Sequence, residues 1–311
     1  MRIAMIGAGA VGGYFGGMLA HGGEDVTIVE RGTTLKAIRD EGLHIDDVKG
    51  DFEVHPRATD DPKSVGFVDA VLLAVKGWQV PGAIETVRPL MGPGTIVVPL
   101  MDGIEAPDQL AAAFGRDRVM GGLAVMYGWV VSPGHIRNTL PDSSISIGEF
   151  GGHRNERVAQ LQNAFEHAGV KAKIVPDIEA SLWQKLIMVG PWSGVGAVTR
   201  APLGVIRSIP ETRELLEGAM REVLAVAQAH GTALPHDSLE QASAFLDRIS
   251  PEALGNMGGI LNGRPTELET EIGVIVRLGR TLGVDVPRHA FLYAVLLPQE
   301  QRARGKIDFR L

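Results

Sequence analysis

The sequence predicts an α/β domain with a mostly parallel sheet, followed by a smaller all-α domain. A short apolar run at the start of the chain leads through a glycine-rich turn into a helical segment. Apolar runs of strand length then alternate with helical segments as far as about residue 175, which is typical of a parallel sheet covered by helices. Beyond that point the apolar residues recur at helical spacing only.

The length and composition indicate two globular domains that act on small molecules. A chain of 311 residues exceeds what one hydrophobic core usually supports, and 45% of the residues are apolar. A net charge of -7 without a basic stripe argues against nucleic acid as a partner. The absence of cysteine excludes disulfides and thiolate nucleophiles and agrees with the cytoplasm, where we expect the protein. The longest later apolar stretch, Val119–Val131, contains glycines and is too short to cross a membrane.

The strongest local signal is a glycine motif between the first strand and the first helix. The strand is predicted over Arg2–Ile6 and the helix over Tyr14–Ala20. In a G-x-G-x-x-G turn the first glycine allows the tight turn, the second lets a pyrophosphate approach the backbone, and the third lets the helix pack on the strand. This order is typical of a Rossmann domain, and the alternative is a glycine-rich turn in another α/β protein. The motif residues, which we predict to bind the cofactor, are Gly7, Ala8, Gly9, Ala10, Val11 and Gly12.

Two charged residues at the end of the second strand point to different cofactors. The predicted strand Val26–Val29 is followed by Glu30, at about the 20-residue interval at which an acid binds the ribose diol of NAD(H). Arg31 comes next, and its guanidinium suits the 2′-phosphate of NADP(H). The sequence leaves both cofactors open, and it also allows a solvated strand end with neither role.

The remaining elements place the domain boundary near residue 176. Residues 1–176 are assigned to the dinucleotide-binding domain, and residues 177–311 to a helical domain for substrate binding or dimerisation. In the helical domain, Gly190-Pro191 is expected to stop or kink the first helix, and Ser208 and Glu211 match a capping box that would begin a later one. Further strands of the first domain are predicted over Ala70–Val75, Thr95–Pro99, Arg118–Met126 and Lys171–Val175.

Two lysines are candidates for chemistry at a carbonyl group. A ketone that accepts a hydride becomes an alkoxide and needs a proton donor near its oxygen, and lysine can fill that role. Lys76 follows a predicted strand at the carboxyl edge of the sheet, where open α/β sheets bind ligands. Lys185 lies on the first helix of the second domain. The alternative for each lysine is a solvated surface charge.

Five segments, in order along nearly the whole chain, resemble one enzyme family. They are Gly7-Ala8-Gly9-Ala10-Val11-Gly12, Val75-Lys76-Gly77-Trp78-Gln79, Asp102-Gly103, Leu182-Trp183-Gln184-Lys185-Leu186 and Gly263-Arg264-Pro265-Thr266-Glu267. Together they resemble the ketopantoate reductases, or 2-dehydropantoate 2-reductases. The resemblance implies a Rossmann domain followed by a helical domain, and NADP(H) as the usual cofactor. It also implies that Lys185 is the general acid, that Glu267 helps to hold the substrate, and that Lys76 and Asp102 lie beside cofactor and substrate.

Three positions depart from the family pattern where the substrate is expected. Asp102, Val189 and Ser193 stand where the family has asparagines. A buried carboxylate at Asp102 would repel an anionic substrate or need a proton, whereas an exposed Asp-Gly turn would have neither effect. Val189 and Trp192 suggest a bulkier or less polar substrate. For Glu267 the alternative is an acid in the first turn of a helix, stabilised by the macrodipole.

The sequence therefore predicts a reductase that converts a 2-oxo acid into a 2-hydroxy acid. The resemblance names ketopantoate as the substrate and pantothenate biosynthesis as the pathway. It favours NADP(H), while Glu30 keeps NAD(H) open. The alternatives are a reductase of a different 2-oxo acid and, in another class, a regulatory protein that binds a dinucleotide without turnover. No metal is expected, and a homodimer is favoured over a monomer.

Overall fold

The computed structural model describes residues 1–152, 156–255, 259–260 and 262–309. The chain divides into two compact units. The first consists of Met1–Met101 and Ala106–Ile178, and the second of Asp102–Glu105 and Glu179–Leu311. The first unit carries the sheets and the second is helical, which confirms the predicted fold class.

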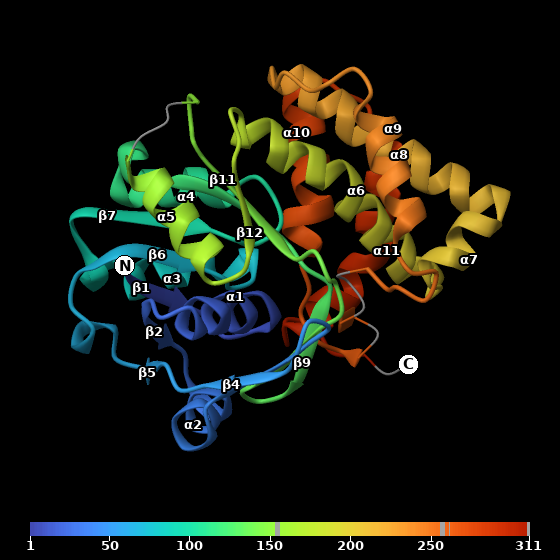
Figure 1. Ribbon diagram of the computed structural model, residues 1–311. Coiled ribbons are helices and arrows are strands. Elements are labelled where there is room, and N and C mark those ends of the chain that lie inside the picture. Colours follow the sequence, from blue (N-terminus) through green and yellow to red (C-terminus); the bar gives the residue numbers. More distant parts are fainter. Residues whose placement is uncertain (153–155, 256–258, 261, 310–311) are drawn as a thin grey trace. The chain divides into compact units, whose positions relative to one another are not determined.

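A parallel sheet with strand order β5-β2-β1-β6-β7 forms the centre of the first unit (Figure 1). Alternate side chains of β1 enter different apolar clusters, Ile3 and Met5 one of them and Ala4 and Ile6 the other. Both faces of the strand are therefore buried, which explains its continuous apolar run. The strands are β1 (Arg2–Ile6), β2 (Asp25–Val29), β5 (Arg57–Thr59), β6 (Val68–Leu73) and β7 (Met91–Pro99).

Two smaller sheets belong to the described part of the first unit. Their strand orders are β4-β3-β10-β9 and β12-β11-β8. The strands are β3 (Leu43–Asp47), β4 (Phe52–Val54), β8 (Met120–Val125), β9 (Gly128–Ser132), β10 (His135–Asn138), β11 (Ser144–Glu149) and β12 (Lys171–Ile174). The helices are α1 (Ala10–His21), α2 (Gly32–Glu41), α3 (Val80–Val87), α4 (Ala106–Phe114) and α5 (Glu156–His167), with short 3-10 turns at Pro62–Ser64, Gly77–Gln79, Arg88–Leu90 and Arg116–Arg118.

Helices α6 to α11, drawn from yellow-green to red in Figure 1, form the second unit around one apolar cluster. Of the two outcomes expected at Gly190-Pro191, a stop is wrong, because α6 continues through both residues, and a kink stays a prediction. The capping box is also wrong: α8 begins at Pro210, and the Ser208 hydroxyl donates to the carbonyl oxygen of Val205 instead. The elements are α6 (Ile178–Thr199), α7 (Leu203–Ser208), α8 (Pro210–His230), α9 (Ser238–Arg248), a π-helix (Glu269–Gly273), α10 (Val274–Leu282) and α11 (Pro287–Ala303).

None of the described helices combines the length and the apolar character that a membrane span requires.

Candidate active site

The glycine-rich turn of the first unit has the geometry that a dinucleotide needs. Gly7 has a φ of +92°, and a Cβ there would lie 2.9 Å from a backbone carbonyl oxygen that follows β6. A Cβ at Gly12 would lie 2.0 Å from the carbonyl oxygen of Gly7, so α1 can pack in this position only without a side chain. A Cβ at Gly9 would meet nothing within 4 Å, and α1 begins just after it with Ala10 and Val11. The open space at a helix N-terminus fits a pyrophosphate group.

The carboxylate of Glu30 is fixed against this turn. Its Oε2 accepts a hydrogen bond from the backbone N–H of Ala8 at 2.8 Å, and its Oε1 accepts one from the N–H of Arg31 at 2.9 Å. The Arg31 side chain is exposed, and in the part of the chain that the structure describes its guanidinium forms no ion pair. The negative charge of Glu30 is thus held beside the turn and is not balanced by the neighbouring arginine.

Lys76 comes from the same edge of the central sheet as the glycine turn. It follows β6, which pairs in parallel with β1, and the carboxyl ends of parallel neighbours lie at one edge. Its backbone N–H donates to Oε1 of Gln79 at 2.9 Å, which holds the short turn after the strand. The first unit therefore places Lys76, Glu30 and the glycine motif at the edge where ligands bind in this fold.

In the second unit Lys185 and Asp102 form an ion pair. The Nζ atom of Lys185, on α6, lies 2.6 Å from Oδ1 of Asp102, and the two side chains are 20% and 19% exposed. The sequence assigned Asp102 to cofactor binding, whereas the structure joins it to the predicted proton donor. A mostly buried ammonium group is suited to donate a hydrogen bond and then a proton to a carbonyl oxygen.

Glu267 is buried in the segment that leads into the π-helix. Only 3% of the residue is exposed, and its Oε2 accepts a hydrogen bond from the hydroxyl of Thr270 at 3.0 Å. The Asp102 loop packs against this segment: Gly103 has a φ of +104°, and a Cβ there would lie 3.0 Å from the carbonyl oxygen of Thr270. The second unit thus gathers Lys185, Asp102 and the Glu267 segment, which are far apart in the sequence.

A buried carboxylate that the sequence did not indicate binds the residue before Glu267. Glu300, 1% exposed on α11, accepts hydrogen bonds from the backbone N–H of Thr266 at 3.0 Å and from its hydroxyl at 2.7 Å. Arg304 donates to the other carboxylate oxygen at 2.7 Å. The four-residue spacing of Glu300 and Arg304 was visible as a helical ion pair, but nothing local in the sequence indicates the partner Thr266.

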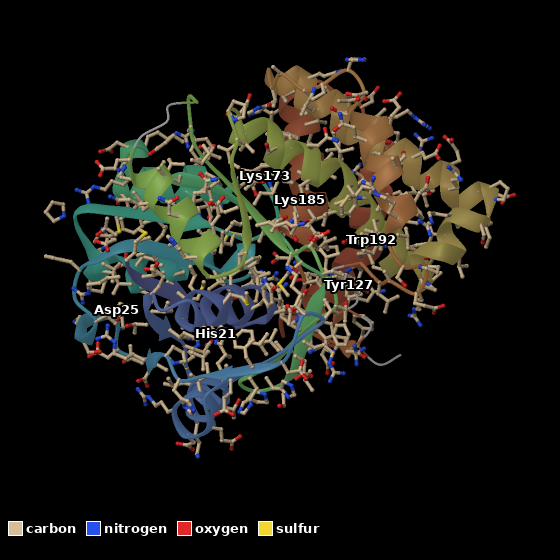
Figure 2. The ribbon with its side chains drawn as sticks, viewed as in Figure 1. His21, Asp25, Tyr127, Lys173, Lys185 and Trp192 are labelled. Carbon is tan, nitrogen blue, oxygen red and sulfur yellow. The ribbon has the colours of Figure 1, made fainter. Side chains whose placement is uncertain are left out.

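The face of α6 that carries Lys185 also carries two large apolar side chains. Val189 and Trp192 follow Lys185 by about one and two helical turns, so they share its side of the helix. Figure 2 labels Lys185 and Trp192 on this helix. Both are buried, and the indole Nε1–H of Trp192 has no hydrogen-bond partner among the described residues. Ser193, beside Trp192, is 1% exposed. A substrate on this face would meet apolar side chains beside the ammonium group.

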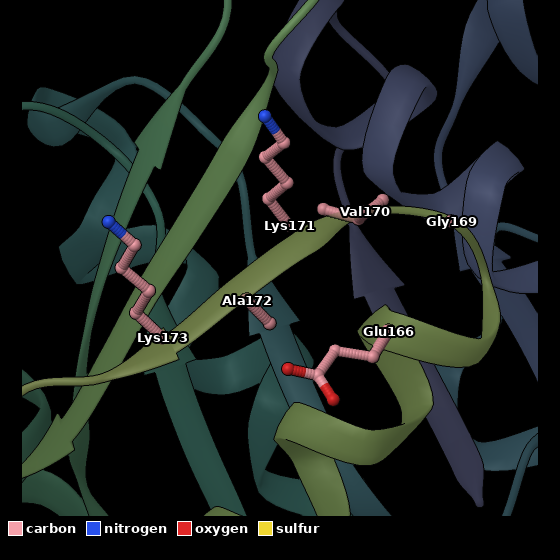
Figure 3. Close-up of a pocket in the computed structure, with 6 residues that line it drawn as sticks. All are labelled: Glu166, Gly169, Val170, Lys171, Ala172 and Lys173. Atoms are coloured by element: carbon pink, nitrogen blue, oxygen red, sulfur yellow. The ribbon is translucent and has the colours of Figure 1, made fainter.

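A depression elsewhere in the first unit contains none of these residues. It lies beside the start of β12 and is open to solvent (Figure 3). Its lining residues are Glu166, Gly169, Val170, Lys171, Ala172 and Lys173.

Comparison with known proteins identifies the family. The model of the N-terminal part of the ketopantoate reductases, PanE/ApbA, matches residues 3–152, and the model of their C-terminal part matches residues 177–300. The chain belongs to the ketopantoate reductase family. This confirms the resemblance seen in the sequence, and it makes the chain a member of a family of nicotinamide-dependent oxidoreductases.

Relatives of the family match over their full length. A 2-dehydropantoate 2-reductase of Mesorhizobium japonicum is 29% identical, with 92% of this chain and 94% of that protein covered. An uncharacterized oxidoreductase of Bacillus subtilis, YkpB, is 28% identical, with 95% and 98% covered. The crystal structure of 2-dehydropantoate 2-reductase from Geobacter metallireducens is 30% identical over 96% of this chain and 99% of that one, with a TM-score of 0.89. The relatives therefore agree on the family but differ in how far their substrate is known.

Proposed function

We propose that this protein reduces the 2-oxo group of a 2-oxo acid or a close derivative to a 2-hydroxy group, using a nicotinamide cofactor. The observation that carries the proposal is the mostly buried ammonium of Lys185, in a chain whose glycine turn has room for a dinucleotide. Ketopantoate is the leading named substrate, because 2-dehydropantoate 2-reductases are among the relatives. We further propose a homodimer that works in the cytoplasm in pantothenate biosynthesis.

Each residue of the site has a role in this reaction. The bound nicotinamide supplies the hydride. Lys185 donates a hydrogen bond to the carbonyl oxygen of the substrate and transfers its proton as negative charge develops there. Glu267, fixed by Thr270, accepts a hydrogen bond from the substrate and orients it. Gly7, Gly9 and Gly12 would hold the pyrophosphate, and Glu30 and Lys76 would hold other parts of the cofactor.

For the cofactor we propose NAD(H) in preference to NADP(H), against the expectation that the family resemblance gave. Glu30 is directed to the glycine turn by two backbone N–H groups, and Arg31 does not pair with it. An unbalanced carboxylate accepts hydrogen bonds from a ribose diol and repels a 2′-phosphate.

The Lys185→Ala variant tests the reaction. A general acid typically contributes about 100- to 10,000-fold, so kcat with ketopantoate should fall by that amount while cofactor fluorescence titration gives an unchanged Kd. The matched control is Lys173→Ala, which removes an exposed lysine of β12 and should leave both values unchanged. Equal kcat values in both variants would contradict the role of Lys185. Turnover that depends on Lys185 would also eliminate a purely regulatory protein.

A second candidate is a reductase of a bulkier 2-oxo acid. Val189 and Trp192 make the Lys185 face of α6 apolar, which favours a large hydrophobic side chain on the substrate. A panel of 2-oxo acids with branched and aromatic side chains decides between the two candidates. A higher kcat/KM for such a compound than for ketopantoate would establish the second.

A further inference from the structure

We propose that Asp102 is a specificity-determining residue, which weakens the preference for a carboxylate next to the reacting carbonyl and thereby extends the substrates to uncharged 2-oxo amides, esters and lactones. The inference rests on the proposed function, because it assumes that the carbonyl oxygen binds at Lys185. It concerns the group on the other side of that carbonyl, which in a 2-oxo acid carries a full negative charge.

The first step is the charge at Lys185. Its ammonium lies 2.6 Å from the Asp102 carboxylate, so the pair is neutral as a whole. With about one-fifth of each side chain exposed, the pair is only weakly screened by water. The attraction that an isolated ammonium would exert on an anion is therefore reduced at the point where the carbonyl binds.

The second step is distance. A carbonyl oxygen that accepts a hydrogen bond from Lys185 lies about 3 Å from Nζ. The carboxylate of a 2-oxo acid is bonded to the carbonyl carbon, so with an ion pair of 2.6 Å its oxygens lie on the order of 5–6 Å from the Asp102 carboxylate. At an effective dielectric constant near 20, two negative charges at that separation correspond to an affinity about 100-fold lower than an uncharged residue 102 would give. An amide or ester at the same position avoids this repulsion.

The third step is that Asp102 cannot easily move away. The positive φ of Gly103 and the close approach of its backbone to Thr270 fix the loop against the segment that carries Glu267. That segment adds another buried carboxylate to the same unit. On the α6 face, Val189 and Trp192 supply no positive charge that could receive a substrate carboxylate.

The test compares two substrates of nearly the same shape that differ in charge, trimethylpyruvate and its primary amide. The quantity to measure is the ratio of their kcat/KM values, in the unmodified enzyme and in Asp102→Asn, which keeps the size of the side chain and removes its charge. Intrinsic differences in reactivity cancel when the two ratios are divided. We expect Asp102→Asn to shift the ratio toward the acid by about 10- to 100-fold. The control is Glu105→Gln, since Glu105 lies in the same loop but pairs with Arg277 at 2.8 Å, and it should leave the ratio unchanged.

Calorimetric binding of the two products, the hydroxy acid and the hydroxy amide, gives a readout without turnover. The ratio of their Kd values should shift in the same direction between the unmodified protein and Asp102→Asn. Identical ratios in both proteins would overturn the inference, and would point to another cation, such as the exposed Arg264, as the partner of the carboxylate. If no variant turns over either substrate but the binding ratio still shifts, the proposed function fails while the role of Asp102 stands.

Discussion

At the scale of single residues, our proposal of NAD(H) over NADP(H) depends on the charge of Glu30, because the two cofactors differ by one phosphate group. Its carboxylate is oriented by the N–H groups of Ala8 and Arg31 beside the glycine turn. In Glu30→Gln the amide can still bind a ribose hydroxyl, but it no longer repels a phosphate. We expect the kcat/KM ratio of NADPH to NADH to rise by about tenfold or more. Arg31→Gln should move the ratio the other way, and an unchanged ratio in both variants would exclude these residues as determinants.

Glu300 is a buried side chain outside the candidate site that fixes the segment carrying Glu267. It binds both the backbone and the hydroxyl of Thr266, the residue before Glu267. Glu300→Gln replaces charged hydrogen bonds by weaker neutral ones and should lower the free energy of unfolding by about 1–3 kcal/mol. Urea denaturation measures this loss. Glu85→Gln, which affects an exposed pair with Arg88, is the control and should leave the midpoint unchanged. Equal midpoints for the two variants would show that the contacts of Glu300 contribute little.

At the scale of elements, the start of α11 is capped by a carboxylate from another helix. Glu222 of α8 accepts hydrogen bonds from the N–H groups of Arg288 and His289, both at 2.9 Å, and from Nδ1 of His289 at 2.8 Å. Burial by itself would raise the pKa of Glu222, but these hydrogen bonds hold it below the usual 4.5. Burial also lowers the pKa of His289 below 6.5, against the attraction of Glu222. Neutral His289 can therefore donate from Nδ1.

This pair predicts a loss of stability in acid. Both groups have a lower pKa in the folded than in the unfolded state, so the unfolded chain binds more protons. The stability that the two groups contribute is complete above a pH of about 6.5. It decreases below that pH as residue 289 becomes protonated in the unfolded chain, and it decreases further below about 4.5 as Glu222 becomes protonated there. Urea unfolding as a function of pH measures this slope. His289→Gln should flatten it just below neutrality, whereas His236→Gln, at an exposed site, should not. An unchanged slope in His289→Gln would contradict the prediction.

The elements that the sequence predicted correctly are those determined by residues close together in the chain. The first strand, the glycine turn and the second strand were predicted correctly, because spacing and glycine positions within about thirty residues determine them. The start of α8 was wrong, since a proline in the first helical turn begins the helix and no side chain caps it. The π-helix at Glu269–Gly273 and the Asp102–Lys185 pair could not be predicted, because both depend on contacts between distant segments.

At the scale of the whole molecule, the two units have separate apolar clusters. Among the described residues, two clusters lie in the first unit and one in the second. A ligand that binds only the folded chain adds to its stability in proportion to the logarithm of its concentration. The cofactor should therefore raise the unfolding temperature of the protein, and the size of the rise reports binding independently of catalysis.

The substitution Gly9→Ala should remove this stabilisation by the cofactor. A Cβ at this position meets nothing within 4 Å, so Gly9→Ala should fold with an unchanged Tm in the absence of ligand. The added methyl group occupies the space where the pyrophosphate would approach the backbone. At a concentration of about 100 Kd, NADH should stabilise the unmodified protein by about 2.7 kcal/mol. A thermal scan detects this as a rise of several degrees in Tm, and the rise should disappear in Gly9→Ala. Gly12→Ala should differ by unfolding more easily even without cofactor, because its Cβ would lie 2.0 Å from the carbonyl oxygen of Gly7. If Gly9→Ala kept the full NADH-dependent rise in Tm, the cofactor would have to bind away from the glycine turn. The assignment of the first unit as the dinucleotide-binding domain would then be wrong.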